Sequence, residues 1–297
     1  MSQPPTAHRR TFARINNPIM FLTTPLERHL DRYRRAGFIV SEQIAIWDPG
    51  LRSGFVNLWP EDLEIMTVGN EGAFTTGADA QLHSDRSHHG VHALELYSSD
   101  TPRLRDYLEH SGVVLPGVRE GRLSSTDNTA PADFFFLDLP QLPGIRTSVM
   151  TSTFPNAAMR SFIDVAPHGV FGLAGLTIIT ARVEEARTAW GAVVEPGVHD
   201  LMFVTPEQWI GSHPDAPLES GIGCVHLLSE NPAGTAAAMV SAGWERGPDV
   251  DGHPHLLPHP EDGVRFTIHR GSAEEWRRRR SDVLGEDLTV RRCPQRG

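Results

Sequence analysis

Histidine side chains alternate with other reactive side chains along two predicted strands in the C-terminal part of the chain. His226 follows Cys224 by two residues, and His269 follows Thr267 by two residues. Because residues two apart point to the same side of a strand, each pair shares one face of a sheet. His226 and His269 could therefore act there as acid–base residues or as ligands. The alternative is that each is a hydrogen-bonded or exposed strand histidine, because a register slip of one residue reverses its facing.

All 27 basic side chains are arginines, and the chain contains no lysine. This excludes Schiff-base chemistry, the phosphate-binding lysine of a P-loop and the strand lysine of a protein kinase. A substrate anion could be bound only by a guanidinium, and the candidates are Arg146, Arg160 and Arg265. A chain without lysine but rich in arginine, alanine, glycine and proline is also typical of a high-GC bacterial genome.

Several common catalytic motifs are missing from the sequence. There is no H-E-x-x-H, no G-x-S-x-G and no C-x-x-C. Gly169, Gly172 and Gly175 are spaced three apart, which does not match a dinucleotide-binding loop. Cys224 could be a nucleophile, but a single strand cysteine is more often a small buried hydrophobe.

The composition is that of a globular protein with an acidic balance. At 297 residues the chain is long enough for two domains or one double domain. The net charge of −10 argues against nucleic acid as a partner. The one basic cluster, Arg277 to Arg280, lies between acidic residues, which favours a solvated helix face.

The expected compartment is the cytoplasm. Two cysteines do not make a disulfide framework, and the N-terminal segment has no apolar stretch of signal-peptide length. The longest weakly polar run, Gly169 to Ile179, is too short to span a bilayer. We expect a small-molecule substrate and no membrane partner. A homodimer is one assembly that the sequence allows.

One pattern of strand, helix, glycine and strand occurs four times. In the first copy, Ile19 to Leu22 reads as a strand, Pro25 suits the first turn of a helix, and Gly37 ends it. The other copies have strands at 92–97, 176–180 and 224–228 and stop glycines at Gly112, Gly191 and Gly243, the third helix being Val183 to Trp190. Two more short strands follow in the first copy, at 54–59 and 63–68, so each unit reads βαβββ, with the third unit shortened after its helix.

Four βαβββ units in a chain of this length resemble the vicinal oxygen chelate superfamily, which includes glyoxalase I, extradiol dioxygenases and bleomycin-resistance proteins. The segments that carry the resemblance are RHLDRYRRAGFIV, GFVNLWPEDLEIMTV, HHGVHALELYSSD and PHGVFGLAGLTII. The resemblance covers most of residues 15 to 270. It implies an α+β fold in which four modules pair into two domains.

The implied domains follow from this pairing. Residues 1–165 form the N-terminal domain, with modules at 15–70 and 88–150. Residues 166–272 form the C-terminal domain, with modules at 170–210 and 220–270. Residues 273–297 form a helical, basic tail.

The resemblance also implies where a metal would be held, because the family takes its ligands from the first and last strands of its modules. The matching positions of the N-terminal half are Asn17, Glu64 and His92, a set that suits Fe, Mn, Zn or Ni. In the C-terminal half the matching positions are Gly175, Cys224 and Thr267. They depart from the His, His and Glu of the extradiol dioxygenases.

Three functions are compatible with these residues. The first is an enzyme of bacterial small-molecule metabolism, a lyase, isomerase or ring-cleaving dioxygenase, that acts on an oxygenated organic substrate by metal-assisted or His/Glu acid–base chemistry. Its catalytic candidates are Glu64, His92, His226 and His269. The second is a metal-free isomerase, cyclase or hydrolase on the same scaffold. The third is a resistance protein that binds a drug without turning it over.

Overall fold

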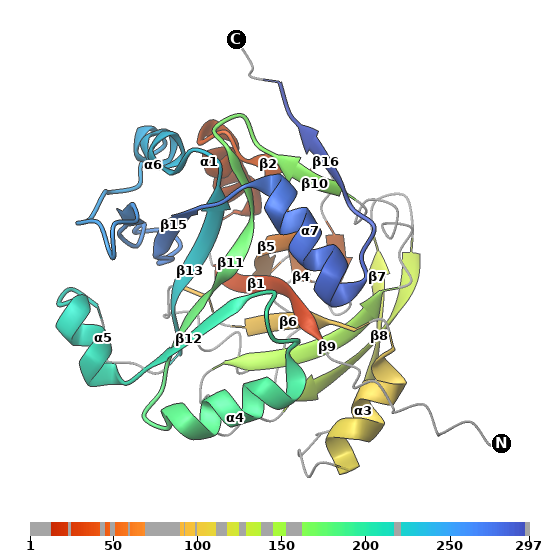
Figure 1. The fold of residues 1–297 in the computed structure, drawn as a ribbon. Coiled ribbons are helices and arrows are strands. Elements are labelled where there is room, and N and C mark those ends of the chain that lie inside the picture. The colour runs from red at the N-terminus through yellow and green to blue at the C-terminus, as the bar shows by residue number, and fades with distance from the viewer. Residues whose placement is uncertain are drawn as a thin grey trace.

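The structure is a computed structural model of the chain. It describes residues 13–22, 25–41, 45–47, 51–58, 60–68, 90–91, 93–98, 100–110, 118–124, 129–137, 145–152, 162–216 and 221–294. The described residues form an α+β fold with two main sheets (Figure 1). The predicted fold class is therefore confirmed.

The first module begins with β1 and α1, and the helix ends as the sequence predicts. Leu26, Leu30 and Tyr33 are buried at helical spacing on one side of α1. Gly37 then adopts a φ of +85°, and the N–H of Phe38 donates to the carbonyl of Tyr33 at 3.1 Å, which closes a Schellman turn. The elements of this module are β1 (Arg14–Leu22), α1 (Leu26–Arg35), β2 (Ile39–Val40), β3 (Ala45–Trp47), β4 (Leu51–Leu58) and β5 (Glu61–Val68).

The second module repeats this order and joins the first through their opening strands. Its elements are β6 (Ala93–Tyr97), α3 (Thr101–His110), β7 (Val118–Ser124), β8 (Thr129–Leu137) and β9 (Arg146–Ser152). The opening strands β1 and β6 pair antiparallel, while each pairs in parallel with the closing strand of its own module, β5 or β9. This arrangement makes β9 the closing strand of module two.

Eight of the nine strands of these two modules close into a ring. The hydrogen-bonded order is β2-β4-β3-β7-β8-β9-β6-β1-β5, and β5 also pairs with β4. The pairing of β3 with β7 links the far ends of the two modules. The first sheet is therefore a closed ring to which β2 is attached.

The third and fourth modules form a smaller, open sheet. The third consists of β11 (Val170–Ile179), α4 (Val183–Val193), β12 (Asp200–Val204) and α5 (Pro206–Ser212). The fourth consists of β13 (Gly221–Ser229), α6 (Pro232–Ser241), β14 (His255–Leu256) and β15 (Phe266–Arg270). The strand order is β12-β11-β13-β15-β14. The shortened third unit is confirmed, because a helix replaces the strands expected after β12.

One helix boundary differs from the prediction. Gly191 does not end α4, which continues to Val193. The buried side chains Ala186, Trp190 and Val193 explain this, because they keep helical spacing past the glycine. A tertiary contact of Val193 therefore outweighs the low helix propensity of glycine.

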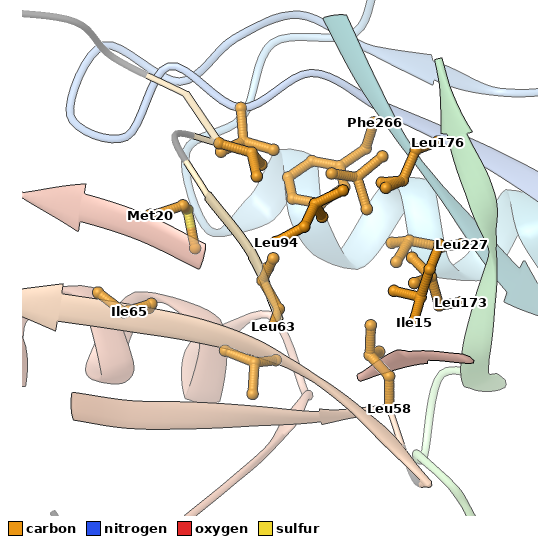
Figure 2. Packing of buried hydrophobic residues seen from close by; sticks show 14 of the residues in the cluster. Ile15, Met20, Leu58, Leu63, Ile65, Leu94, Leu173, Leu176, Leu227 and Phe266 are labelled. Carbon is orange, nitrogen blue, oxygen red and sulfur yellow. The ribbon is translucent and has the colours of Figure 1, made fainter. Parts of the chain in front are cut away.

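The two sheets share one main hydrophobic cluster (Figure 2). Ile15, Leu63 and Leu94 of the first sheet and Leu173 and Leu227 of the second are almost completely buried in it. Each fully buried side chain of this size contributes roughly 1.5–3 kcal/mol. The faces of the strands that do not enter this cluster carry the polar side chains described below.

The C-terminal segment folds back onto the molecule. Helix α7 (Ala273–Leu284) packs beside the two-stranded sheet of β10 (Phe162–Val165) and β16 (Thr289–Arg292), as Figure 1 shows. The prediction that Arg277 to Arg280 form a solvated face is wrong for Arg280, which is completely buried and ion-paired with Glu61. None of the helices in the described part of the chain is long and apolar enough to cross a membrane.

Candidate active site

Two histidines meet on the polar face of the second sheet. Strands β13 and β15 pair in parallel, with His226 opposite Thr267 and Leu228 opposite His269. This register places His226 and His269 on one face, and Nδ1 of His226 lies 3.0 Å from Nε2 of His269. The expectation that His226 shares a face with Cys224, and His269 with Thr267, is confirmed, and the strand pairing places both pairs on the same face. We call the side that carries Cys224, His226, Thr267 and His269 the histidine face.

The other ring nitrogen of His226, Nε2, also has a partner. Its Nε2 lies 2.8 Å from the hydroxyl of Thr177 on β11, so both ring nitrogens of this buried side chain have partners. His269 is only partly buried, and the ring of His253 lies 4.2 Å from it. His253 is placed by a two-residue hairpin turn in which Asp251 and Gly252 both have positive φ, as a type I′ turn requires.

The imidazoles of His226 and His269 are neutral at pH 7. Burial and the neighbouring His269 lower the pKa of His226 to about 3. Burial and the neighbouring His253 lower the pKa of His269 to about 4. In each neutral ring one nitrogen carries a proton and the other a lone pair, so one ring of the pair donates to the other. The pair can therefore accept a proton or pass one on.

A second hydrogen-bonded row lies on the same face. Nη1 of Arg265 lies 2.9 Å from Nε2 of His255, which identifies Nε2 as the nitrogen with the lone pair, since a guanidinium only donates. His255 therefore carries its proton on Nδ1 and donates it to the hydroxyl of Thr267 at 3.2 Å. That hydroxyl lies 3.3 Å from Sγ of Cys224. Burial raises the pKa of Cys224 to about 12, so its thiol stays protonated.

A different polar cluster lies on the first sheet. Nδ2 of Asn17 donates to Glu64 at 3.1 Å and to Glu95 at 3.2 Å, and Nδ2 of Asn16 donates to Glu95 at 2.6 Å. All four side chains are at least nine-tenths buried. The cluster gathers two carboxylates and two amides from β1, β5 and β6.

The structure thus brings Asn17 and Glu64 together, as the resemblance implies, and adds Asn16 and Glu95. His92, the third predicted member, lies outside the described residues. Glu95 was missed because it reaches Asn17 through a β-bulge at Asn16, where the register between β1 and β6 shifts. The sequence held one signal for it: Glu95 alternates with Ala93 and Tyr97 along β6, so these three side chains share one face of that strand. Of the three candidate arginines, the structure describes the side chain of Arg265 alone.

A divalent metal does not fit the described part of this cluster as it stands. The amide of Asn17 presents N–H groups, not its oxygen, to both carboxylates. Among the described residues, no three or more His, Cys, Asp or Glu side chains are arranged to hold a metal ion. The predicted set of His92, Glu64 and Asn17 therefore stays a prediction that depends on His92.

The second sheet departs further from the family's ligand pattern. A side chain at position 175 has no room, because a Cβ built on Gly175 would lie 1.9 Å from the carbonyl oxygen of Asp200. Cys224 and Thr267 are occupied by the hydrogen bond between them. The imidazoles of His226 and His269 lie at other positions of the same face.

No protein-family model and no curated protein sequence matches the chain. Solved structures, in contrast, match the chain in fold. A hypothetical protein from Staphylococcus aureus is 8% identical with a TM-score of 0.61, and the match covers 88% of this chain and 100% of that one. A triple variant of 4-hydroxymandelate synthase from Streptomyces coelicolor, a member of the vicinal oxygen chelate superfamily, is 11% identical with a TM-score of 0.53 over 88% and 93% of the two chains. The chain has the vicinal oxygen chelate fold. At these identities the likeness is one of fold, and the chemistry of this chain has to be argued from its own side chains.

Proposed function

We propose that this chain is an enzyme with a vicinal oxygen chelate fold that acts on a small oxygenated organic molecule, and that the His226–His269 pair moves a proton in its reaction. The observation that carries this proposal is the 3.0 Å contact between the two ring nitrogens on the histidine face. A contact between two neutral imidazoles is a ready path for a proton.

The two rings have different parts in this proposal. His269 is the more exposed of the two and takes the proton from the substrate or returns it. His226 is buried behind it and shares the proton through the contact between Nδ1 and Nε2. Thr177 holds the other nitrogen of His226 and so fixes the orientation of the ring. His269 is the catalytic residue, and His226 and Thr177 position it.

Proton transfer next to a carbonyl group is the chemistry that this arrangement supports best. It is the common step of the isomerase and lyase reactions expected from the sequence. The similarity in fold to a 4-hydroxymandelate synthase supports an enzyme over a binding protein. The ring-cleaving dioxygenase alternative is less well supported, because Gly175, Cys224 and Thr267 stand at the positions of the ligand triad.

The metal-assisted alternative belongs to the first sheet. Glu64 and Asn17, together with His92, would hold a divalent ion there, and that ion would polarise a substrate oxygen. Glu64 would otherwise act as a general base, with Asn16 and Asn17 orienting the substrate. A chelator separates the two possibilities, since a reaction carried by His226 and His269 survives it.

The proposal is tested by deuterium exchange. Incubation of the protein in D2O with small ketones, 2-oxo acids and 3-oxo acids should remove the proton signal next to the carbonyl group of the substrate. We expect His269→Gln to lower the exchange rate by about 10²-fold or more, the usual contribution of an acid–base residue. His110→Gln, which changes an exposed histidine of α3, is the matched control.

Three results would contradict the proposal. Exchange that persists in both His269→Gln and His226→Gln excludes the histidine pair. Exchange that disappears with a chelator and in Glu64→Gln moves the chemistry to the first sheet. Retention of a ligand without exchange or product supports the drug-binding alternative.

A further inference from the structure

A buried guanidinium lies on the same face as the histidine pair. The side chain of Arg265 is only 3% exposed, and its group lies over the ring of Trp209 with Cζ 5.8 Å from the centroid. Nη1 contacts His255, and Nη2 donates to Oδ2 of Asp215 at 2.8 Å. One edge of the guanidinium is thus held by the protein core and the other by a single carboxylate.

Arg265 is aligned with the proposed proton-transfer pair. Arg265 immediately precedes β15, and its carbonyl still accepts from the N–H of Val225 on β13. Arg265, Thr267 and His269 therefore alternate along one extended segment, and their side chains lie on the same face. At about 3.3 Å per residue, the Cα atoms of Arg265 and His269 are roughly 13 Å apart.

The carboxylate that pairs with Arg265 has little else to hold it. Asp215 lies in the turn after α5, and its side chain is 53% exposed, in contrast with the buried arginine. Arg265 is the only side chain of the described residues to which Asp215 is hydrogen-bonded. An exposed carboxylate that moves away is rehydrated at little cost, whereas a buried guanidinium left without a partner is strongly unfavourable.

We infer that Arg265 binds the carboxylate of an acidic substrate, and that Asp215 fills this position until the substrate displaces it. The inference rests on the proposed function, because it names the substrate class of the same face. The exchange is balanced, since one carboxylate leaves the guanidinium as another arrives and the arginine stays paired throughout. Because the chain has no lysine, this role falls to an arginine, whose planar group can bind a carboxylate through two parallel hydrogen bonds.

An anion at this site would also help the histidine pair. Negative charge near an imidazole favours its protonated form. Burial and His253 lower the pKa of His269, and the carboxylates of Asp200 and Asp251 already offset part of that effect. An acidic substrate would therefore make His269 a stronger base only while the substrate is bound.

Isothermal titration with sodium benzoate tests the inference, with benzamide as the uncharged probe of the same shape. We expect Asp215→Asn to bind benzoate about tenfold more tightly than the wild type, because the internal competitor has lost its charge. Arg265→Gln should lose benzoate binding, and benzamide should give the same weak response in all three proteins. Because Arg265→Gln removes a buried partner of His255, Arg265→Lys serves as a second variant. It keeps the charge, loses the fork and should bind benzoate less tightly than the wild type.

Unchanged benzoate affinity in Asp215→Asn would overturn the inference and leave the ion pair as a structural link between the turn after α5 and the residue that precedes β15. Benzoate binding that survives in Arg265→Gln would overturn it as well. The proposed function fails separately: if His269→Gln keeps full deuterium exchange while Asp215→Asn still tightens benzoate, the proton-transfer role is wrong and the carboxylate site stands.

Discussion

At the scale of single residues, two glycines of the third module have opposite surroundings. A Cβ on Gly175 would meet the backbone of Asp200 at 1.9 Å, whereas a Cβ on Gly191 would meet nothing within 4 Å. We expect Gly175→Ala to lower the free energy of unfolding by about 3 kcal/mol or more, because the backbone of β12 cannot yield as a side chain would. Urea unfolding measures this change.

Gly191→Ala is the matched substitution. Gly191 lies inside α4, and alanine has the higher helix propensity, so this variant should gain about 0.5–1 kcal/mol. Equal effects of the two substitutions would contradict the close approach of β11 and β12 at Gly175. The same approach explains why a histidine, which the extradiol pattern places here, could not fit.

The residues of the candidate site could be predicted only where a local rule decides their placement. The period of two was sufficient to put His226 on the face of Cys224 along β13, and His269 on the face of Thr267 along β15. Only the pairing of the two strands shows that these two faces are the same one. The same rule did not find Glu95, because the bulge at Asn16 changes the register between β1 and β6. The hairpin that brings His253 to His269 depends on Asp251 and Gly252, a turn pair that the sequence shows but whose direction only the fold determines.

At the scale of elements, α7 is fixed by a buried ion pair and not by its basic surface. Arg280 is completely buried, contacts Glu61 of β5, and donates to Glu286 at 2.7 Å. Burial raises the pKa of Glu61, but Arg280 and the neighbouring His199 and Arg14 outweigh it and lower that pKa to about 2. We expect Arg280→Ala to cost about 3–5 kcal/mol, because it leaves Glu61 buried without its main partner.

The neighbouring Arg278→Ala is the control, since that side chain is exposed on the same helix and should change stability by less than about 0.5 kcal/mol. Chemical denaturation of both variants decides the matter. A loss in Arg280→Ala no larger than that in Arg278→Ala would show that α7 is held by its apolar contacts alone.

The order of the elements followed from the sequence more readily than their ends or their long-range pairing. The repeat predicted four units and the shortened third one. It misplaced the end of α4, because the burial of Val193 extends the helix past Gly191. It also treated four successive arginines alike, although helical geometry turns Arg280 inward and Arg278 outward. The pairing of β3 with β7 that closes the ring joins segments far apart in the chain and has no local signal.

At the scale of the whole molecule, buried neutral histidines make the fold sensitive to acid. Burial is the main cause that lowers the pKa of His226 to about 3 and the pKa of His168 and His255 to about 4. In the unfolded chain these groups have the ordinary value of 6.5. Below that pH the unfolded chain binds protons that the native protein does not, so the free energy of unfolding falls as the pH drops from about 6.5 to about 4.

Urea unfolding at several pH values between 7.5 and 4.5 measures this dependence. Each such histidine contributes up to about 1.4 kcal/mol per pH unit in that window. His168→Gln should remove one proton's share of the slope, and His110→Gln, at an exposed position of α3, is the matched substitution. Asp262 has the opposite effect on stability, because burial raises its pKa to about 6 and the native protein therefore binds a proton there as the pH falls. This one group opposes several histidines. A stability that does not change between pH 6.5 and 4.5 would contradict the buried neutral state.

The pairing of β10 with β16 has a consequence for how the chain matures on the ribosome. Strand β10 lies near the middle of the chain, yet its parallel partner is made of residues 289–292. The small cluster behind it joins Ile163 and Phe171 to Trp276 and Leu288, which are also synthesised late. The ring of the first sheet can close during translation, since domains generally fold from the N-terminus onward. The two-stranded sheet can form only after residues 289–292 have been synthesised, so a chain cut short before β16 would leave β10 as an open edge exposed to other chains.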